Sequence, residues 1–576
     1  MVKMKISKIQ IKNFKSLQDV ALNDLGNMVV LIGKNSSGKS NMLEALYKFF
    51  NDFNLIEPSP VGPVTGFDNH LWYDIKTKNP IEITLWVKFD AKECEEIFPT
   101  EALNMVRKRF PESYNQVSFC RRVVNVKTGW KTEYVKWADI PLVRDNKLVS
   151  PEELCKSLTV PPPRETTTPR FPESAAAKII GKVAPSLQER VKGKFRLAKV
   201  TRDSVERPSD LVMRAPIVDS ETYEMLRFLK QSRTHEDIKR WIDVEKMFEN
   251  ASSMRLDIRE GEIFARKREL CLPIHLIGGG DQEALILKRF LMREDSITAI
   301  EEPEMHLHPR LIMRVLELIK AISARSQVFL ATHSPIIIDR VDIQNVWIAK
   351  METEETRFIG FGDAEEMRNM LMELDTPLSN ILFAEKVLLV EGLLEKVMLP
   401  IFAKNMGIDP DGFSIIPVKP KLKGQNGFFT LFRREPSVEY RLRIWSEISR
   451  KIGIPLFLLL RKAAKNEVEA LIQEGYLPRR NCAILSTGIE NYIPVETLVS
   501  VLNENYRIRL TTKDIDAKRP RMVEIKRILT ERKKLHPGWK TFIAEKVAEK
   551  MPREKIPDEI KMLFESMLIV SLGPQP

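Results

Sequence analysis

A glycine-rich loop between an apolar run and a helical segment constrains this chain more than any other feature. The loop, Gly33 to Ser40, reads GKNSSGKS and fits the pattern G-x-x-x-x-G-K-[ST]. It follows MVVLI at Met28 to Ile32, which predicts a buried strand, and it precedes helical spacing from Asn41 to Phe50. Such a loop turns its backbone N–H groups toward phosphates, while its lysine reaches the terminal phosphates and its serine hydroxyl binds magnesium. We therefore predict a site for ATP and Mg2+ that includes Gly33, Asn35, Gly38, Lys39, Ser40 and Asn41.

The second half of such a site is expected at an apolar strand that ends in acidic residues. The segment ITAIEE at 297–302 has this form. Glu301 would support the magnesium and Glu302 would polarise the attacking water, although motifs of this kind usually carry aspartate at the first position. One helix and one strand later, His333 lies in ATHSP, where a histidine can contact the terminal phosphate. We predict Lys39, Glu302 and His333 as catalytic residues, and Ser40 and Glu301 as ligands of the magnesium.

A run of three glycines at 278–280 precedes a further helical pattern. With Asp281 and Gln282 it resembles the signature of ABC-type ATPases, whose N–H groups and helix start bind ATP held by another subunit. The usual serine of that signature is absent. The order of the four motifs along the chain is that of an ABC-type ATPase. We therefore predict that Gly279, Gly280 and Gln282 bind ATP across a homodimer or a higher homo-oligomer.

Alternating strand and helix patterns predict an α/β protein with a doubly wound sheet and two successive domains. The first is expected at 1–365 as an ABC-type P-loop ATPase domain. Within it, a loosely patterned stretch at about 95–250 contains the proline-rich segment TVPPPRETTTPRFP, and we interpret it as a helical insertion used for dimerisation. A second α/β series is expected at 380–576, ending in a basic and largely helical segment.

Charge and cysteine usage limit the class of protein. The chain has 91 basic and 79 acidic side chains, so a net charge of +12 permits a nucleic-acid surface without proving one. The five cysteines are widely spaced and odd in number, which argues against a disulfide scaffold or a zinc ribbon and fits a reducing cytoplasm. Since no apolar run approaches the length of a membrane span, we expect a cytoplasmic protein without a membrane partner.

Motifs in the second half resemble a known family. FAEKVLLVEGLLE at 383–395 resembles the opening of a Toprim domain, and GIENYIP at 488–494 resembles a later motif that carries an acidic ligand. Together with EEPE and a downstream His-Pro in the ATPase half, they look like the overcoming-lysogenization-defect (OLD) nuclease family, which includes Gabija-type antiphage proteins. The resemblance implies a Toprim-like domain at 380–576, DNA as a partner, a role in DNA repair or phage defence, and room for a helicase-like or other defence partner.

The strand that should end in the D-x-D motif of a Toprim domain lacks both aspartates. PLFLLL continues as RKAAKNE, so Arg461 and Ala463 occupy the expected aspartate positions. Magnesium prefers hard oxygen ligands, and two-metal hydrolysis needs ligands for both ions. Glu391, Glu395 and Glu490 are left as a vestigial or weak Toprim metal site.

Two functions are compatible with these motifs. In the first, the chain binds and hydrolyses ATP and acts on DNA, but its Toprim nuclease domain is impaired. In the alternative, it is an active DNA endonuclease that depends on ATP and metal. The fused second half argues against a transporter subunit, and the missing aspartates argue against a primase or topoisomerase.

Overall fold

A computed structural model of the chain divides it into two compact units, Met1–Gly362 and Asp363–Pro576, which we call unit 1 and unit 2. The structure describes residues 4–51, 79–123, 130–144, 147–159, 173–192, 194–199, 220–252, 254–259, 262–273, 297–305, 307–352, 354–360, 379, 384–418, 438–516 and 518–571. The predicted domain limits at 365 and 380 lie outside these residues. Each unit is described by itself.

Unit 1 contains a mainly parallel six-stranded sheet in the order β16-β15-β3-β14-β13-β9. Only the edge strand β16 runs antiparallel to its neighbour. Because β3, β14 and β13 are adjacent and parallel, their carboxyl ends share one edge of the sheet. The strands are β3 (Met28–Ile32), β9 (Phe195–Lys199), β13 (Ile297–Glu301), β14 (Gln327–Thr332), β15 (Val346–Glu352) and β16 (Glu355–Gly360).

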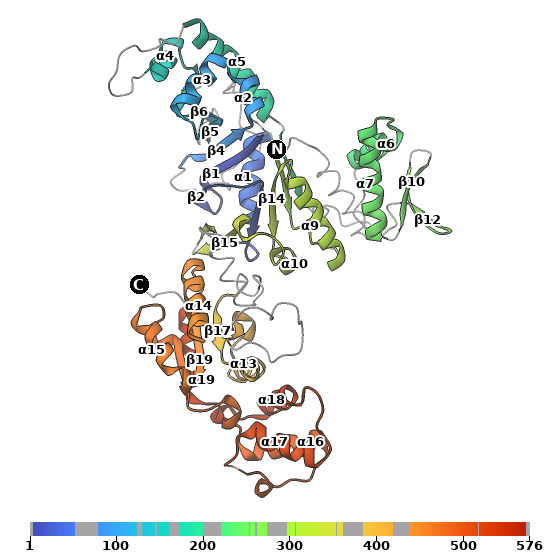
Figure 1. Ribbon diagram of the computed structural model, residues 1–576, viewed down its shortest axis with the longest axis vertical. Helices are drawn as coiled ribbons and strands as arrows, with labels where there is room; N and C mark the ends of the chain where they lie inside the picture. Colours follow the sequence, from blue (N-terminus) through green and yellow to red (C-terminus); the bar gives the residue numbers. More distant parts are fainter. Residues whose placement is uncertain are drawn as a thin grey trace. The chain divides into compact units, whose positions relative to one another are not determined.

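Helix α1 (Lys39–Asn51) begins at the end of the glycine-rich loop. Its buried residues follow helical spacing and pack in one hydrophobic core with β3, β13 and β14. Figure 1 shows α1 beside β14. Helices α9 (Pro309–Ser323) and α10 (Pro335–Ile338) precede and follow β14. The first residue of α1 is therefore held at the sheet edge where β3 ends.

A second, antiparallel sheet of unit 1 has seven strands in the order β2-β1-β4-β5-β6-β7-β8. Its inner face shares the hydrophobic core of the parallel sheet. The strands are β1 (Met4–Phe14), β2 (Leu17–Leu22), β4 (Ile81–Phe89), β5 (Gln116–Val123), β6 (Trp130–Trp137), β7 (Ile140–Arg144) and β8 (Lys147–Leu148). Two sheets on one core give unit 1 a layered α/β architecture.

The expectation of a helical segment at about 95–250 is wrong in part. The segment does contain helices, which are α3 (Thr100–Arg109), α4 (Pro151–Thr159), α5 (Glu173–Val191), α6 (Ser220–Gln231) and α7 (His235–Ser252), and α2 (Ala91–Ile97) enters it. However, β5 to β8 extend the antiparallel sheet and β9 joins the parallel one. Residues 116–123 bury apolar side chains against β4, so pairing with a distant strand decides their conformation.

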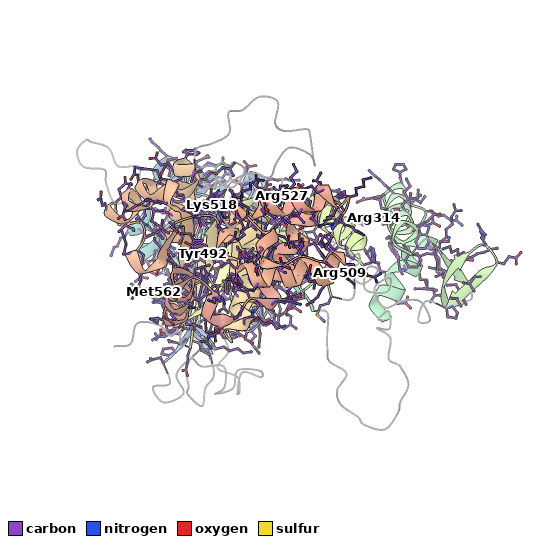
Figure 2. The ribbon with its side chains drawn as sticks, turned by 90° about the horizontal axis from the view of Figure 1, so that it is seen from below. Arg314, Tyr492, Arg509, Lys518, Arg527 and Met562 are labelled. Atoms are coloured by element: carbon purple, nitrogen blue, oxygen red, sulfur yellow. The ribbon has the colours of Figure 1, made fainter. Side chains whose placement is uncertain are left out.

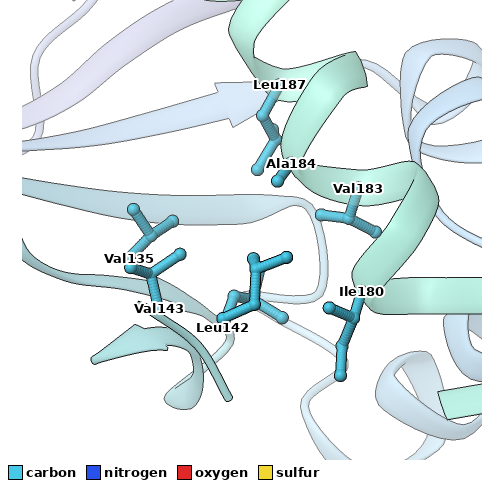
Figure 3. A pocket seen from close by; sticks show the side chains of 8 residues that line it. Val135, Leu142, Val143, Ile180, Val183, Ala184 and Leu187 are labelled. Carbon is cyan, nitrogen blue, oxygen red and sulfur yellow. The ribbon is translucent and has the colours of Figure 1, made fainter. Parts of the chain in front are cut away.

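Helices α6 and α7 pack on a small antiparallel sheet of β10 (Arg255–Arg259), β11 (Glu262–Lys267) and β12 (Leu270–Pro273) (Figure 1). These three strands pair in succession and form an antiparallel meander. Elsewhere in unit 1, α5 leaves a small pocket against β6 to β8, where Ile180, Val183 and Leu187 face Val135 and Leu142 (Figure 3). The named lining is aliphatic, so this pocket supplies no group for chemistry.

Unit 2 is built on a parallel sheet in the order β18-β17-β19-β20. Its strands are β17 (Val387–Val390), β18 (Ser414–Pro417), β19 (Leu456–Arg461) and β20 (Cys482–Leu485). Its helices are α13 (Leu393–Asn405), α14 (Val438–Ile452), α15 (Lys465–Gln473), α16 (Val495–Tyr506), α17 (Arg521–Glu531), α18 (Trp539–Lys550) and α19 (Asp558–Ser571). In the part of the chain that the structure describes, no helix is both long and apolar enough to cross a membrane.

Candidate nucleotide site and Toprim-like site

The loop after β3 adopts a conformation that requires glycine at two positions. Gly33 has a φ of +153° and Gly38 a φ of +96°. A Cβ at Gly33 would lie 2.3 Å from the carbonyl oxygen of Ala349, and one at Gly38 would lie 2.1 Å from Thr356 Oγ1. Strands β15 and β16 therefore press against the loop, and only a backbone without Cβ atoms fits there.

The Lys39 side chain lies inside the loop and binds its backbone. Its side chain is buried, and its Nζ donates hydrogen bonds to the carbonyl oxygens of Gly33 at 2.8 Å and Lys34 at 2.9 Å. Burial lowers the pKa of Lys39, and three neighbouring carboxylates oppose that shift. The carboxylates belong to Glu302, Glu301 and Glu304. The lysine of the glycine-rich loop and the acidic end of β13 thus occupy one electrostatic site.

The other polar side chains in and after the loop differ in exposure and in hydrogen bonding. Asn35 and Ser40 are exposed, whereas Asn41 donates a hydrogen bond to Ser16 Oγ at 2.8 Å. Ser37 Oγ is buried and has no hydrogen-bond partner among the described residues. A buried hydroxyl without a partner, beside loop N–H groups at a helix start, fits a phosphate ligand. Magnesium bound there would neutralise phosphate charge, and Ser40 and Glu301 would hold it.

Glu301, Glu302 and His333 come together because their strands are neighbours. Glu301 ends β13 and pairs in register with Ala331 of β14, which in turn lies beside β3. Glu302 has a φ of +49°, a conformation that few residues other than glycine adopt, and its N–H donates to the Ala331 carbonyl at 2.8 Å. This turn places Glu302 Oε1 3.5 Å from His333 Nδ1.

Glu304 belongs to the same site although the motif analysis assigned it no role. Its Oε1 accepts hydrogen bonds from Thr332 Oγ1 at 2.7 Å and from the His333 backbone N–H at 2.9 Å. The only signal in the sequence was its place as the last residue of EEPE. The predicted signature residues Gly279, Gly280 and Gln282 lie outside the described residues.

Unit 2 gathers its predicted acidic residues at the carboxyl edge of its own sheet. Glu391 follows β17, Glu395 lies in the first turn of α13, and Glu490 lies in a 3-10 helix after β20. Arg461, the last residue of β19, interacts electrostatically with all three. Its Nε and Nη2 each bind one carboxylate oxygen of Glu391 in a bidentate ion pair. A guanidinium is therefore paired with one carboxylate of this acidic group and lies within electrostatic range of the other two.

Burial and neighbouring charges shift the pKa values of residues in this acidic group. Only 6% of Glu395 is exposed, and burial together with Glu490 and Glu391 raises its pKa. The hydrogen bond to Glu391 raises the pKa of Arg461. No set of three His, Cys, Asp or Glu side chains within the described ranges is arranged to hold a metal ion. Glu469, on α15, is paired with Arg479.

Comparison with known proteins agrees with both halves of this description. Residues 4–158 match the family "AAA ATPase domain". Residues 201–339 match "AAA domain, putative AbiEii toxin, Type IV TA system". Residues 382–431 match "Overcoming lysogenization defect protein-like, TOPRIM domain".

Two curated relatives align across both units. The OLD nuclease of Thermus scotoductus is 23% identical over 440 residues, covering 72% of this chain and 76% of that protein. The chain resembles the OLD-like family in its Toprim segment at 382–431 and in its alignment with this nuclease. Endonuclease GajA of Bacillus cereus is 25% identical to this OLD-like chain over 435 residues, covering 69% and 67% of the two chains. These matches confirm the predicted combination of a P-loop ATPase region with a Toprim domain.

Among solved structures, the SMC head domain from Thermotoga maritima matches the OLD-like chain with 15% identity and a TM-score of 0.31. It covers 62% of this chain and 98% of that one. An Smc head bound to the C-winged helix domain of ScpA gives 14% identity, a TM-score of 0.36 and coverage of 63% and 99%. Scores this low support no conclusion about shared architecture.

Proposed function

We propose that this OLD-like chain binds and hydrolyses ATP and acts on DNA, with a Toprim-like domain that is impaired as a nuclease. The observation that carries the proposal is the contrast between the two carboxyl sheet edges. In unit 1, Lys39 hydrogen-bonds only backbone carbonyls in the contacts described above, so Glu301 and Glu302 keep their oxygens for other partners. In unit 2, Arg461 occupies both oxygens of Glu391.

In unit 1 each residue has a distinct task in ATP hydrolysis. The loop N–H groups and Lys39 bind the phosphates, and Ser40 and Glu301 hold the magnesium. Glu302 lies on a turn at the mouth of the site, with 29% of its side chain exposed, and there it orients and polarises a water molecule. His333, within reach of Glu302, contacts the terminal phosphate. Charge on the transferred phosphoryl group is thereby stabilised from several sides.

The site is completed by a second subunit. Gly279, Gly280 and Gln282 would bind the ATP held by a partner copy, so we propose a homodimer or a higher homo-oligomer with ATP between its ATPase units. The segment at about 95–250 is proposed to contribute to that contact. Static light scattering of the full chain tests this, with a mass increase expected on ATP addition. A strictly monomeric protein with and without ATP would refute binding in trans.

DNA is the proposed partner of unit 2. Between Arg507 and Lys540 the chain has twelve basic and four acidic residues. Arg519 and Arg527 form ion pairs with local acids, but Arg509 and Lys518, both labelled in Figure 2, are exposed. Exposed cations of this density suit a phosphate backbone, and salt weakens such binding steeply. A helicase-like or other defence partner and a role in phage defence are further proposals, which rest on the resemblance of the sequence motifs to the OLD family.

The alternative, an active metal-dependent endonuclease, has two observations in its favour. Glu391, Glu395 and Glu490 lie together at the sheet edge, and both relatives are named as nucleases. For metal to bind there, the bidentate Arg461–Glu391 pair would first have to break. That requirement is why we favour the impaired nuclease.

Paired ATPase and plasmid-nicking assays on one preparation test the proposal. We expect ATP hydrolysis that Lys39→Ala abolishes and that Glu302→Gln lowers by about 10^2- to 10^4-fold. Lys92→Ala, at an exposed lysine of α2, is the matched control and should leave hydrolysis unchanged. We expect no nicking with Mg2+ or Mn2+. Nicking that Glu391→Ala abolishes would establish the alternative, and a chain without ATP hydrolysis would overturn the first part.

A further inference from the structure

Glu304 has contacts that differ from those of the other two glutamates at this sheet edge. Its side chain is 8% exposed, compared with 29% for Glu302. The bonds to Thr332 Oγ1 and to the His333 N–H both end on Oε1, whereas Oε2 is buried without a partner among the described residues. Its carboxylate is therefore directed at the strand end that carries the histidine.

The residues that Glu304 binds are themselves held by further hydrogen bonds to the backbone. Thr332 is the last residue of β14, and its hydroxyl accepts a hydrogen bond from the Ser334 N–H at 3.0 Å. Ser334 in turn precedes α10 and accepts the N–H of Ile337. Two bonds to one carboxylate oxygen and one to a hydroxyl thus fix three successive residues, with His333 in the middle.

The imidazole of His333 lies between two carboxylates. Its Nδ1 is 3.5 Å from Glu302 Oε1 and 3.6 Å from Glu304 Oε1. Glu302 is the more exposed of the two and is free to turn toward a water molecule, while Glu304 is held by the Thr332 hydroxyl and the His333 backbone N–H. The ring is 44% exposed, so few packing contacts define its direction and the carboxylates must do so.

We propose that Glu304 is a positioning residue that sets the place and direction of His333 for ATP hydrolysis; this rests on the proposed ATPase function. Glu304 does not touch the phosphates in this assignment. It acts through the His333 backbone and ring, so its contribution exists only while the histidine is present. A displacement of about 1 Å in a catalytic group can lower a rate by about 10^2-fold.

The test is a double-mutant cycle on ATP hydrolysis with Glu304→Ala, His333→Ala and the double variant. We expect each single variant to lower kcat by about 10^2-fold with KM for ATP changed less than about threefold. The double variant should be no slower than His333→Ala alone. Glu304→Gln keeps an oxygen that accepts both hydrogen bonds, so it should recover most of the activity that Glu304→Ala loses.

The possible results separate this inference from the proposed function. If the wild-type chain shows no Lys39-dependent hydrolysis, both are overturned. If it hydrolyses ATP but the effects of Glu304→Ala and His333→Ala multiply in the double variant, only the positioning role is overturned. Equal loss of kcat in Glu304→Gln and Glu304→Ala would also overturn it. Thermal melting of each variant identifies loss of fold, which would change KM and melting temperature together.

Discussion

Gln327 offers the sharpest test of how the two sheets of unit 1 are joined. This first residue of β14 is fully buried. Its Oε1 accepts the Ile6 N–H at 2.7 Å, and its Nε2 donates to the carbonyls of Ile6 at 2.7 Å and Gly26 at 2.8 Å. The pairing of β1 with β2 begins only at Ile9, so β2 offers Ile6 no backbone partner. The side-chain amide of Gln327 instead makes the two hydrogen bonds that a neighbouring strand would make with the Ile6 backbone.

The magnitude follows from the groups that Gln327→Leu would leave behind. The substitution keeps a similar volume but leaves one N–H and two carbonyls without hydrogen-bond partners. Each buried unsatisfied group costs about 1–3 kcal/mol. Greater apolar burial by leucine offsets about 1 kcal/mol. We expect a net loss of about 2–8 kcal/mol in the free energy of unfolding. At about 2 °C per kcal/mol for a large domain, unit 1 should melt roughly 4–16 °C lower.

Two measurements on the full chain check this value. Scanning calorimetry follows unit 1, with the transition of unit 2 as internal reference, and hydrogen exchange reports local opening of β1. Gln10→Leu is the matched control, since that amide makes only an exposed 3.4 Å bond to Asp19. If Gln327→Leu melts within about 1 °C of the control and leaves the exchange of β1 amides unchanged, the bridging role is refuted.

Two further predictions concern the candidate sites. Burial raises the pKa of Glu395, so its ionised form destabilises the folded state above the ordinary value of 4.5, and stability falls as pH rises. Glu395→Gln should therefore raise the melting temperature of unit 2 at pH 8 and lose that gain as pH approaches 4.5; an equal gain at both pH values would contradict the assignment. Gly38→Ala should weaken ATP binding by at least about tenfold in equilibrium dialysis, because its Cβ would meet Thr356 Oγ1 at 2.1 Å. Gly181→Ala, where a Cβ meets nothing within 4 Å, should bind ATP normally.

Local motifs made much of the nucleotide site predictable. The loop Gly33 to Ser40, the acidic end of β13 and His333 after β14 each follow a short apolar strand. Parallel neighbours place such strand ends at one edge, so the order of motifs was enough to expect their meeting. The roles of these residues remain predictions, and the signature-like segment lies outside the described residues.

Long-range pairing accounts for what sequence patterns missed. Residues 116–148 read as loosely patterned, yet β4 draws them into an antiparallel sheet. Gln327 bonds to Ile6 across 321 positions, and no local rule anticipates a buried amide that completes another strand. Glu304 similarly reaches Thr332 across 28 positions. Such contacts depend on which strands become neighbours, which periodicity alone does not specify.

A cationic side chain and several glutamates lie at the carboxyl edge of each parallel sheet, but the cation interacts with the glutamates differently in the two units. The Lys39 ammonium is a compact charge that donates hydrogen bonds to loop carbonyls. Its interaction with the carboxylates at the end of β13 is electrostatic. The Arg461 guanidinium is a planar fork whose two nitrogens match the two oxygens of Glu391. A point charge leaves oxygens for magnesium and water, whereas a bidentate fork removes them. On this difference in cation geometry, more than on the number of acids, rests the proposal of ATP hydrolysis in unit 1 and of an impaired nuclease site in unit 2.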